Sequence, residues 1–179
     1  MIIKTYELNK INNKIKIFLL YGNNNGFKDE IIKNFFENKF KKKIYRYDEN
    51  EILHNKENFY NIIFTKSLFE DEKLIIISRV SDKIKDIINE VIEKEIDDTT
   101  IILNSNNLDK KSKLRSLFEK NKRTICIPFY EDNSQTLSSI ASSFFKEKKI
   151  PISQETINLL IERCRGDRLN LKNELNKIE

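Results

Sequence analysis

The chain has 179 residues, of which 39% are hydrophobic and 34% charged, and its formal net charge is +5. This length suits one domain or a domain with a small appendage, and the hydrophobic share is sufficient for a packed core. No apolar run approaches the roughly 20 residues of a membrane span, and residues 1–10 lack the apolar stretch of a signal peptide. The composition therefore argues against a membrane protein and favours a soluble one.

The few cysteines and the single histidine argue against a disulfide-stabilised protein and against a metal-binding protein. Cys126 and Cys164 are too few for a disulfide framework and favour a reducing cytosol. With only His54 beside them, the sequence shows no metal-ligand spacing, and we expect no metal site.

The positive charge permits contact with nucleic acid without requiring it, and we interpret the lysine-rich stretch 39–43 as solvated surface.

A buried strand at 16–21 is the first predicted element, and it runs into a tight loop and then a helical pattern. Strand, loop and helix in this order form the phosphate-binding loop of nucleotide-binding proteins. Such a loop needs glycines, so that backbone N–H groups can surround the phosphates. It also needs a Lys that reaches the outer phosphates and a Ser or Thr hydroxyl that holds Mg²⁺.

The loop of this chain keeps that architecture without its chemistry. Gly22, Gly26 and Lys28 are present, but Phe27 precedes the lysine and Asp29 follows it. A carboxylate in the place of the magnesium-binding hydroxyl would repel a triphosphate. We therefore predict a degenerate loop that binds no nucleotide, as in a structural or mechanical part of a nucleotide-driven machine.

Five β-branched runs alternate with helical patterns along the first 128 residues. The strands are predicted at 15–21, 44–47, 73–80, 100–103 and 124–127, and the helices at 27–40, 57–64, 81–92 and 108–120. The central strands are apolar at successive positions, which is typical of parallel strands covered on both faces. We predict an α/β fold with a parallel five-stranded sheet and helices on both faces.

After Pro128 the sequence contains three helical patterns and no strand. Ser153 is expected to cap the second helix, and Gly166-Asp167 to end it and cap the third. We predict two domains, an α/β domain over 1–130 and a small three-helix domain over 131–179. The apolar series of the last helix is still in phase at Glu179, so we expect the natural polypeptide to continue.

Two further positions bear on a possible nucleotide site. After the third strand, where an active enzyme would carry acidic residues, the chain has Ser-Arg-Val-Ser at 78–81, so a second catalytic part is missing. Asn104, at the end of the fourth strand, could sense a terminal phosphate. The favoured alternative is a polar turn in which Asp109 or Ser112 caps the next helix. Cys164 could be a reactive thiol, but it continues an apolar stripe and is expected in the core.

Ser67-Leu68-Phe69 precedes the third strand and is followed at once by polar residues. Two large apolar side chains in this setting could form an exposed anchor that fills a pocket of a partner protein. The residues by themselves favour the other interpretation, in which Leu68 and Phe69 pack into the core of their own domain.

Several short segments, in order, resemble the delta subunit of the bacterial DNA polymerase III clamp loader over the whole chain. The segments are Leu20-Tyr21-Gly22, Ser67-Leu68-Phe69 before Lys73-Leu74, residues 108–114 (LDKKSKL), Gly166-Asp167-Arg168-Leu169 and Asn173-Glu174-Leu175. The resemblance implies an N-terminal domain of the AAA+ (P-loop NTPase) type followed by a helical lid. This chain would lack the collar domain that follows the lid in that family.

The resemblance also implies a function. A delta subunit has no intrinsic enzymatic activity and no cofactor, and it serves the DNA polymerase III holoenzyme in the cytoplasm at the replisome. Its partners are the sliding clamp (beta subunit), the gamma/tau and delta prime subunits, and primed DNA within the loader. The family's clamp-binding Leu-Phe pair matches Leu68 and Phe69, with Ser67 beside them, so the resemblance favours the exposed anchor.

Two alternatives from other classes remain at this point. One is an active ATPase module with an unusual phosphate loop. The other is a basic nucleic-acid-binding domain, whose affinity for DNA would depend steeply on salt concentration.

Overall fold

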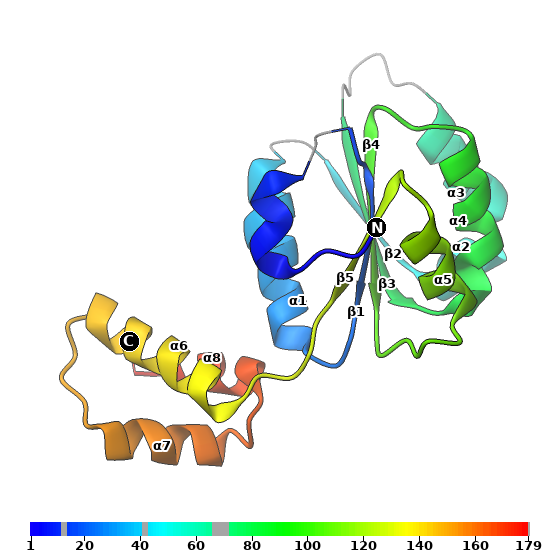
Figure 1. Cartoon of the computed structure of the whole chain (residues 1–179). Coiled ribbons are helices and arrows are strands. Elements are labelled where there is room, and N and C mark those ends of the chain that lie inside the picture. The colour runs from blue at the N-terminus through cyan, green and yellow to red at the C-terminus, as the bar shows by residue number, and fades with distance from the viewer. Residues whose placement is uncertain (12–13, 41–42, 66–71, 179) are drawn as a thin grey trace. The chain divides into compact units, whose positions relative to one another are not determined.

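The computed structural model describes residues 1–11, 14–40, 43–65 and 72–178 (Figure 1). Its internal contacts divide the chain into two compact units. The α/β unit consists of Met1–Gly22 and Ile31–Pro128, and the helical unit consists of Asn23–Glu30 and Phe129–Glu179. This division differs from the expected one mainly in residues 23–30, which were expected in the first domain but have their contacts with the C-terminal helices.

The α/β unit contains the five-stranded parallel sheet that the sequence predicts. Its strands are β1 (Ile17–Tyr21), β2 (Ile44–Asp48), β3 (Lys73–Val80), β4 (Thr99–Ser105) and β5 (Thr124–Pro128). The order across the sheet is β2-β3-β4-β1-β5, and every neighbouring pair is parallel. Because β1, β3 and β4 lie inside the sheet with both faces covered, their residues are apolar at successive positions.

Helices cover both faces of this sheet (Figure 1). One side carries α2 (Glu49–His54), α3 (Lys56–Phe64), a 3-10 turn (Asp82–Ile84), α4 (Lys85–Glu93) and α5 (Lys113–Lys120). The other side carries a 3-10 helix (Thr5–Lys10), a π-helical segment (Ile32–Phe36) and a 3-10 turn (Glu37–Lys39). Alternate residues of β1 serve the two sides. Leu19 packs in the core shared with α2–α5, whereas Phe18 meets Phe36 edge to face, with ring centroids 5.0 Å apart.

The helices around residues 25–40, 49–54 and 108–120 differ from the prediction. The helix expected at 27–40 is regular only in α1 (Asn25–Ile31) and then continues in π and 3-10 form. A helix at 49–54 was not expected, and it is started by a capping box in which Asp48 and Glu51 bond each other's backbone N–H groups. The helix expected from 108 begins at Lys113, because the Ser112 hydroxyl caps it by accepting from Arg115 N at 3.1 Å.

The helical unit packs α6 (Ser134–Glu147), α7 (Gln154–Arg163) and α8 (Arg168–Asn176) round a small core, together with residues 25–30 of α1. The core residues are Leu137, Ala141, Phe145, Ile157, Ile161, Cys164, Leu171 and Leu175. Ser153 caps α7 and Asp167 caps α8, as the sequence predicts. Among the described residues, none of the helices combines the length and apolar character needed to cross a membrane.

A buried lysine joins the end of α3 to the start of β3. The Lys73 ammonium donates to the carbonyl oxygens of Ile62 (2.9 Å) and Thr65 (2.7 Å), which lie at the C-terminal end of α3. Carbonyls at a helix C-terminus have no partner within the helix, and the helix dipole favours a cation there. Lys73 therefore caps α3 from the neighbouring strand.

We expect Lys73→Met to lower the free energy of unfolding by about 1–3 kcal/mol, because two buried carbonyl groups lose their donor. Urea unfolding followed by circular dichroism measures the change. The control is Lys83→Met, since Lys83 is exposed. Equal stability of the two variants would contradict the capping role.

Candidate functional site

The segment expected to be a degenerate phosphate loop has its backbone N–H groups bonded within the protein. Asn24 N donates to the carbonyl of Phe129 (3.4 Å), and Asn25 N donates to the carbonyl two residues before it (2.9 Å). Phe27 N donates to the side-chain oxygen of Asn24 (3.1 Å), and Lys28 N donates to the Asn24 carbonyl (3.1 Å). In a working loop such N–H groups bind phosphate oxygens. Here four of them already have protein acceptors.

Each of the two glycines of the loop meets a requirement of the backbone. Gly22 has φ = 127°, a conformation that side-chain-bearing residues rarely adopt, and its N–H donates to the carbonyl of Asn106 at 3.2 Å. At Gly26 a Cβ atom would lie only 2.9 Å from the backbone nitrogen of Leu169. Gly26 therefore permits α1 to approach the start of α8 closely.

Lys28, the residue at the position of a phosphate-binding lysine, is fully buried. Burial lowers the pKa of its ammonium to about 8, while the charge of the adjacent Asp29 opposes the shift. A lysine that binds a triphosphate must present a charged ammonium to the ligand. Lys28 lies instead in an environment that disfavours its charged form.

Arg168, the first residue of α8, is the centre of a charged cluster within the helical unit. Its guanidinium makes two bonds to the Asp132 carboxylate, from Nε (2.7 Å) and from Nη2 (3.0 Å). Nη1 lies 3.3 Å from Glu30, and the guanidinium carbon is 3.9 Å from the centre of the Phe27 ring. The side chains of Arg168 and Asp132 are each only 7% exposed. Sequence reasoning named Arg168 only as part of a resembling segment and missed its partners.

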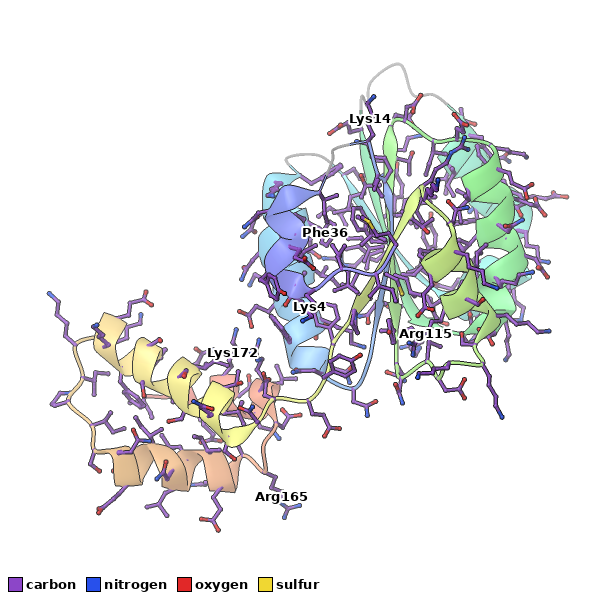
Figure 2. All side chains as sticks on the ribbon, viewed as in Figure 1. Lys4, Lys14, Phe36, Arg115, Arg165 and Lys172 are labelled. Carbon is purple, nitrogen blue, oxygen red and sulfur yellow. The ribbon has the colours of Figure 1, made fainter. Side chains whose placement is uncertain are left out.

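A cavity of about 290 Å³ lies beside this cluster in the helical unit. It is lined by Asn23, Asn24, Glu131, Asp132, Arg165, Gly166, Asp167 and Arg168. Arg165 is exposed and extends away from the helices in Figure 2. Within the described part of the chain, no group of three or more His, Cys, Asp or Glu side chains could hold a metal ion.

The positions near the ends of β3 and β4 that could belong to a nucleotide site are as follows in the structure. Arg79, in β3, has φ = 56° and pairs with Asp48 at 2.5 Å, so a cation stands where an active enzyme would carry acidic residues. Asn104 is half-buried in β4. Of the two predicted caps, Ser112 caps α5, whereas Asp109 accepts from Lys111 N (2.7 Å) in the preceding turn.

Both cysteines are packed in the core. Cys164 is buried among the apolar residues of the helical unit, as predicted, and burial raises the pKa of its thiol. Burial also raises the pKa of Cys126, in β5, to about 12. Because the thiolate is the reactive form, neither cysteine is set up as a nucleophile.

The predicted clamp-binding residues Ser67, Leu68 and Phe69 lie outside the described residues. The described residues on either side of them are Thr65, which ends α3, and Glu72, which precedes β3.

The comparisons with known proteins support the fold. No family model and no curated protein matches the sequence. Solved structures do match, among them RuvB and the replication initiator DnaA, so the fold is α/β and AAA+-like. This agrees with the predicted fold class.

Three of these structures are particularly informative. The DNA clamp loader delta protein of Bacillus subtilis has 16% sequence identity and a TM-score of 0.62, with 96% of this chain and 55% of that chain covered. The replication initiator DnaA, bound to AMPPCP and single-stranded DNA, has 18% identity, a TM-score of 0.63 and coverages of 97% and 58%. RuvB of Thermotoga maritima has 13% identity and a TM-score of 0.60, with 89% of this chain and 53% of that chain covered. The chain thus spans little more than half the length of each.

The buried Lys28 predicts a pH dependence of stability. Between pH 8 and about 10.4 the folded state has lost this proton while the unfolded state keeps it, so stability rises with pH in that window. Below pH 8 the lysine is protonated in both states, so this pH dependence ends there. We therefore expect the stability difference between Lys28→Met and wild type to shift in favour of wild type by up to about 3 kcal/mol between pH 7 and pH 10.5.

Unfolding by urea at pH 7, 8, 9 and 10 measures this difference. The same substitution at Lys33, which is exposed, is the control. Parallel pH curves for Lys28→Met and wild type would contradict the effect of burial.

Proposed function

We propose that the chain is a non-catalytic subunit of the clamp-loader delta type, which binds and opens a ring-shaped sliding clamp. The observation that carries the proposal is the phosphate-loop segment, whose N–H groups at Asn24, Asn25, Phe27 and Lys28 are bonded within the protein. The AAA+-type fold is therefore retained without a free cradle for a triphosphate. A protein that keeps this fold for its shape and not for hydrolysis fits the role of a delta subunit.

The cost of admitting a nucleotide supports the same conclusion. A triphosphate would have to replace four internal hydrogen bonds, and each buried donor or acceptor left without a partner costs about 1–3 kcal/mol. It would also meet the Asp29 carboxylate at the place of the magnesium-binding hydroxyl. These costs argue against the alternative of an active ATPase with an unusual phosphate loop.

The proposed clamp-binding element is Leu68-Phe69 with Ser67, in the segment that connects α3 to β3. Its two apolar side chains would enter a pocket on the clamp, while the α/β unit would fit the clamp interface only in its opened form. A ligand shifts an equilibrium only by preferring one state, so opening requires this difference in affinity.

The proposed partners follow from the same role. They are the clamp, the gamma/tau and delta prime subunits and primed DNA, in the cytoplasm. The chain covers 55% of the Bacillus subtilis clamp loader delta protein. Assembly with the other loader subunits is therefore proposed for a longer polypeptide that contains these two units.

One observation favours the alternative of a nucleic-acid-binding domain. Lys85, Lys113 and Lys120 line a shallow groove of about 340 Å³ formed by α4 and α5. Binding to DNA through such lysines would weaken steeply with salt, because phosphate contacts release counterions. Clamp binding that depends on Leu68 and Phe69 would be mainly apolar and far less sensitive to salt.

We expect no binding of Mg-ATP in the micromolar range and no ATP turnover. Isothermal calorimetry on the full chain measures the first, and phosphate release measures the second. Lys28→Ala is the control for contaminating ATPases. Turnover by a contaminant would be the same in preparations of this variant and of wild type. A micromolar isotherm, or turnover that this variant abolishes, would support the active ATPase instead.

The double change Leu68→Ala plus Phe69→Ala should weaken clamp binding at least about a hundredfold and leave the melting temperature nearly unchanged. Burial of each side chain contributes roughly 1.5–3 kcal/mol, and central interface anchors commonly cost 2 kcal/mol or more on truncation. Each 1.4 kcal/mol is a factor of ten in affinity. Surface plasmon resonance with the clamp of the same organism measures the affinity.

The matched control is Leu159→Ala, because Leu159 is a leucine of α7 that is 64% exposed. If the Leu68-Phe69 pair is core, the double variant should lose about 4 kcal/mol or more of stability, and a collapsed melting temperature would show it. Normal melting together with unchanged clamp affinity would remove the pair from the binding site.

A further inference from the structure

Residues 23–30 are separated from the C-terminal helices by about a hundred residues of sequence, yet they belong to the helical unit. They are joined to it by the polar side chains of Asn24 and Glu30. The Asn24 amide nitrogen donates to the carboxylate of Asp132 (2.8 Å) and to the carbonyl of Tyr130 (3.0 Å). The Glu30 carboxylate lies 2.7 Å from Lys172 in α8. These contacts hold residues 23–30 against the C-terminal helices.

Arg168 connects these contacts. The Asp132 carboxylate accepts three hydrogen bonds, two from Arg168 and one from Asn24. Two cations, Arg168 and Lys172, face two anions, Asp132 and Glu30, so the cluster is electrically balanced. A buried ion pair is favourable only when its geometry is good and its remaining lone pairs are bonded. Both conditions are met here, by the two-point bond from Arg168 and by the Asn24 amide.

The position of Arg168 in α8 indicates that its charge does not stabilise α8 itself. It is the first residue after the cap Asp167, at the end of the helix where the dipole disfavours a cation. Its contacts instead reach Asp132, before α6, and Glu30 and Phe27, in α1.

Close packing at a second point holds the same segment. Gly26 approaches the Leu169 backbone so closely that a Cβ atom would meet it at 2.9 Å. This contact involves no charge, so it is independent evidence that α1 and the start of α8 are built to fit together.

We propose that Arg168 is a positioning residue that straps residues 23–30 to the helical unit without nucleotide, with the Asp132 carboxylate as its permanent internal anion. In this arrangement no phosphate is required to bring the loop segment and the helices together. Residues 23–30 therefore act as part of the helical unit, and the chain passes between the two units three times, at 22–23, 30–31 and 128–129. The inference does not depend on clamp binding.

Amide hydrogen exchange on the full chain, read by NMR, tests the strap. Arg168→Gln removes the charge and the two-point bond while keeping much of the side-chain length. We expect the amides of Asn24, Phe27 and Lys28 to exchange at least about tenfold faster, whereas those of β1 and β4 keep their rates. Arg165→Gln is the matched control, because Arg165 is a nearby exposed arginine, and it should change none of these rates.

Two further variants sharpen the test. Asp132→Asn should also speed the exchange of these amides, and the effects of the two changes should be less than additive in the double variant, because both remove the Arg168–Asp132 ion pair. Arg168→Lys, which keeps the charge but not the fork, should fall between wild type and Arg168→Gln. It also provides the comparison if the glutamine variant does not fold.

Saturating Mg-ATP or inorganic phosphate should leave the wild-type rates unchanged. The proposal is overturned by any of four results. These are unchanged rates at residues 24–28 in both Arg168 variants, equal loss of protection throughout the sheet, additive effects in the double variant, and slower exchange at residues 24–28 on addition of Mg-ATP.

Discussion

Asn24 makes five hydrogen bonds with its backbone and side chain, and the character of the whole phosphate-loop region depends on them. Its N–H binds Phe129, its carbonyl and side-chain oxygen accept from Lys28 and Phe27, and its amide nitrogen donates to Tyr130 and Asp132. A single buried side chain thus closes the loop on itself and attaches it to the chain that leads into α6. Both effects follow from the amide group, which carries a donor and an acceptor at once.

The two cationic side chains near this loop, like its N–H groups, are engaged within the protein. In a nucleotide-binding protein, the lysine of such a loop is available to the phosphates of the ligand. Here Lys28 is buried with a lowered pKa, and Arg168 is bonded to Asp132. The DnaA structure, bound to AMPPCP and single-stranded DNA, is similar in fold. Because one fold can carry different sites, function has to be argued from the site.

In the proposed role, the parallel sheet covered on both faces would serve as a support for the clamp-binding segment. It is a rigid platform, and Lys73 ties the end of α3 to the start of β3 on either side of the segment that contains Leu68 and Phe69. A segment whose two ends are held loses less conformational freedom on binding than a free chain. This is a physical reason for presenting an apolar pair on an AAA+-type unit in the proposed clamp-binding role.

The sequence by itself determined the parallel sheet, the amphipathic α4, the caps at Ser153 and Asp167, and the unsuitable residues of the phosphate loop, and it narrowed the cap of α5 to Asp109 or Ser112. Each of these is a local property, set by the period of apolar residues or by one side chain bonding a backbone group nearby. Only the tertiary structure decided that residues 23–30 join the C-terminal helices and that Arg168 meets Asp132 and Glu30. These partners are 36 and 138 residues away from Arg168, and local patterns do not specify which distant carboxylate a buried arginine will meet.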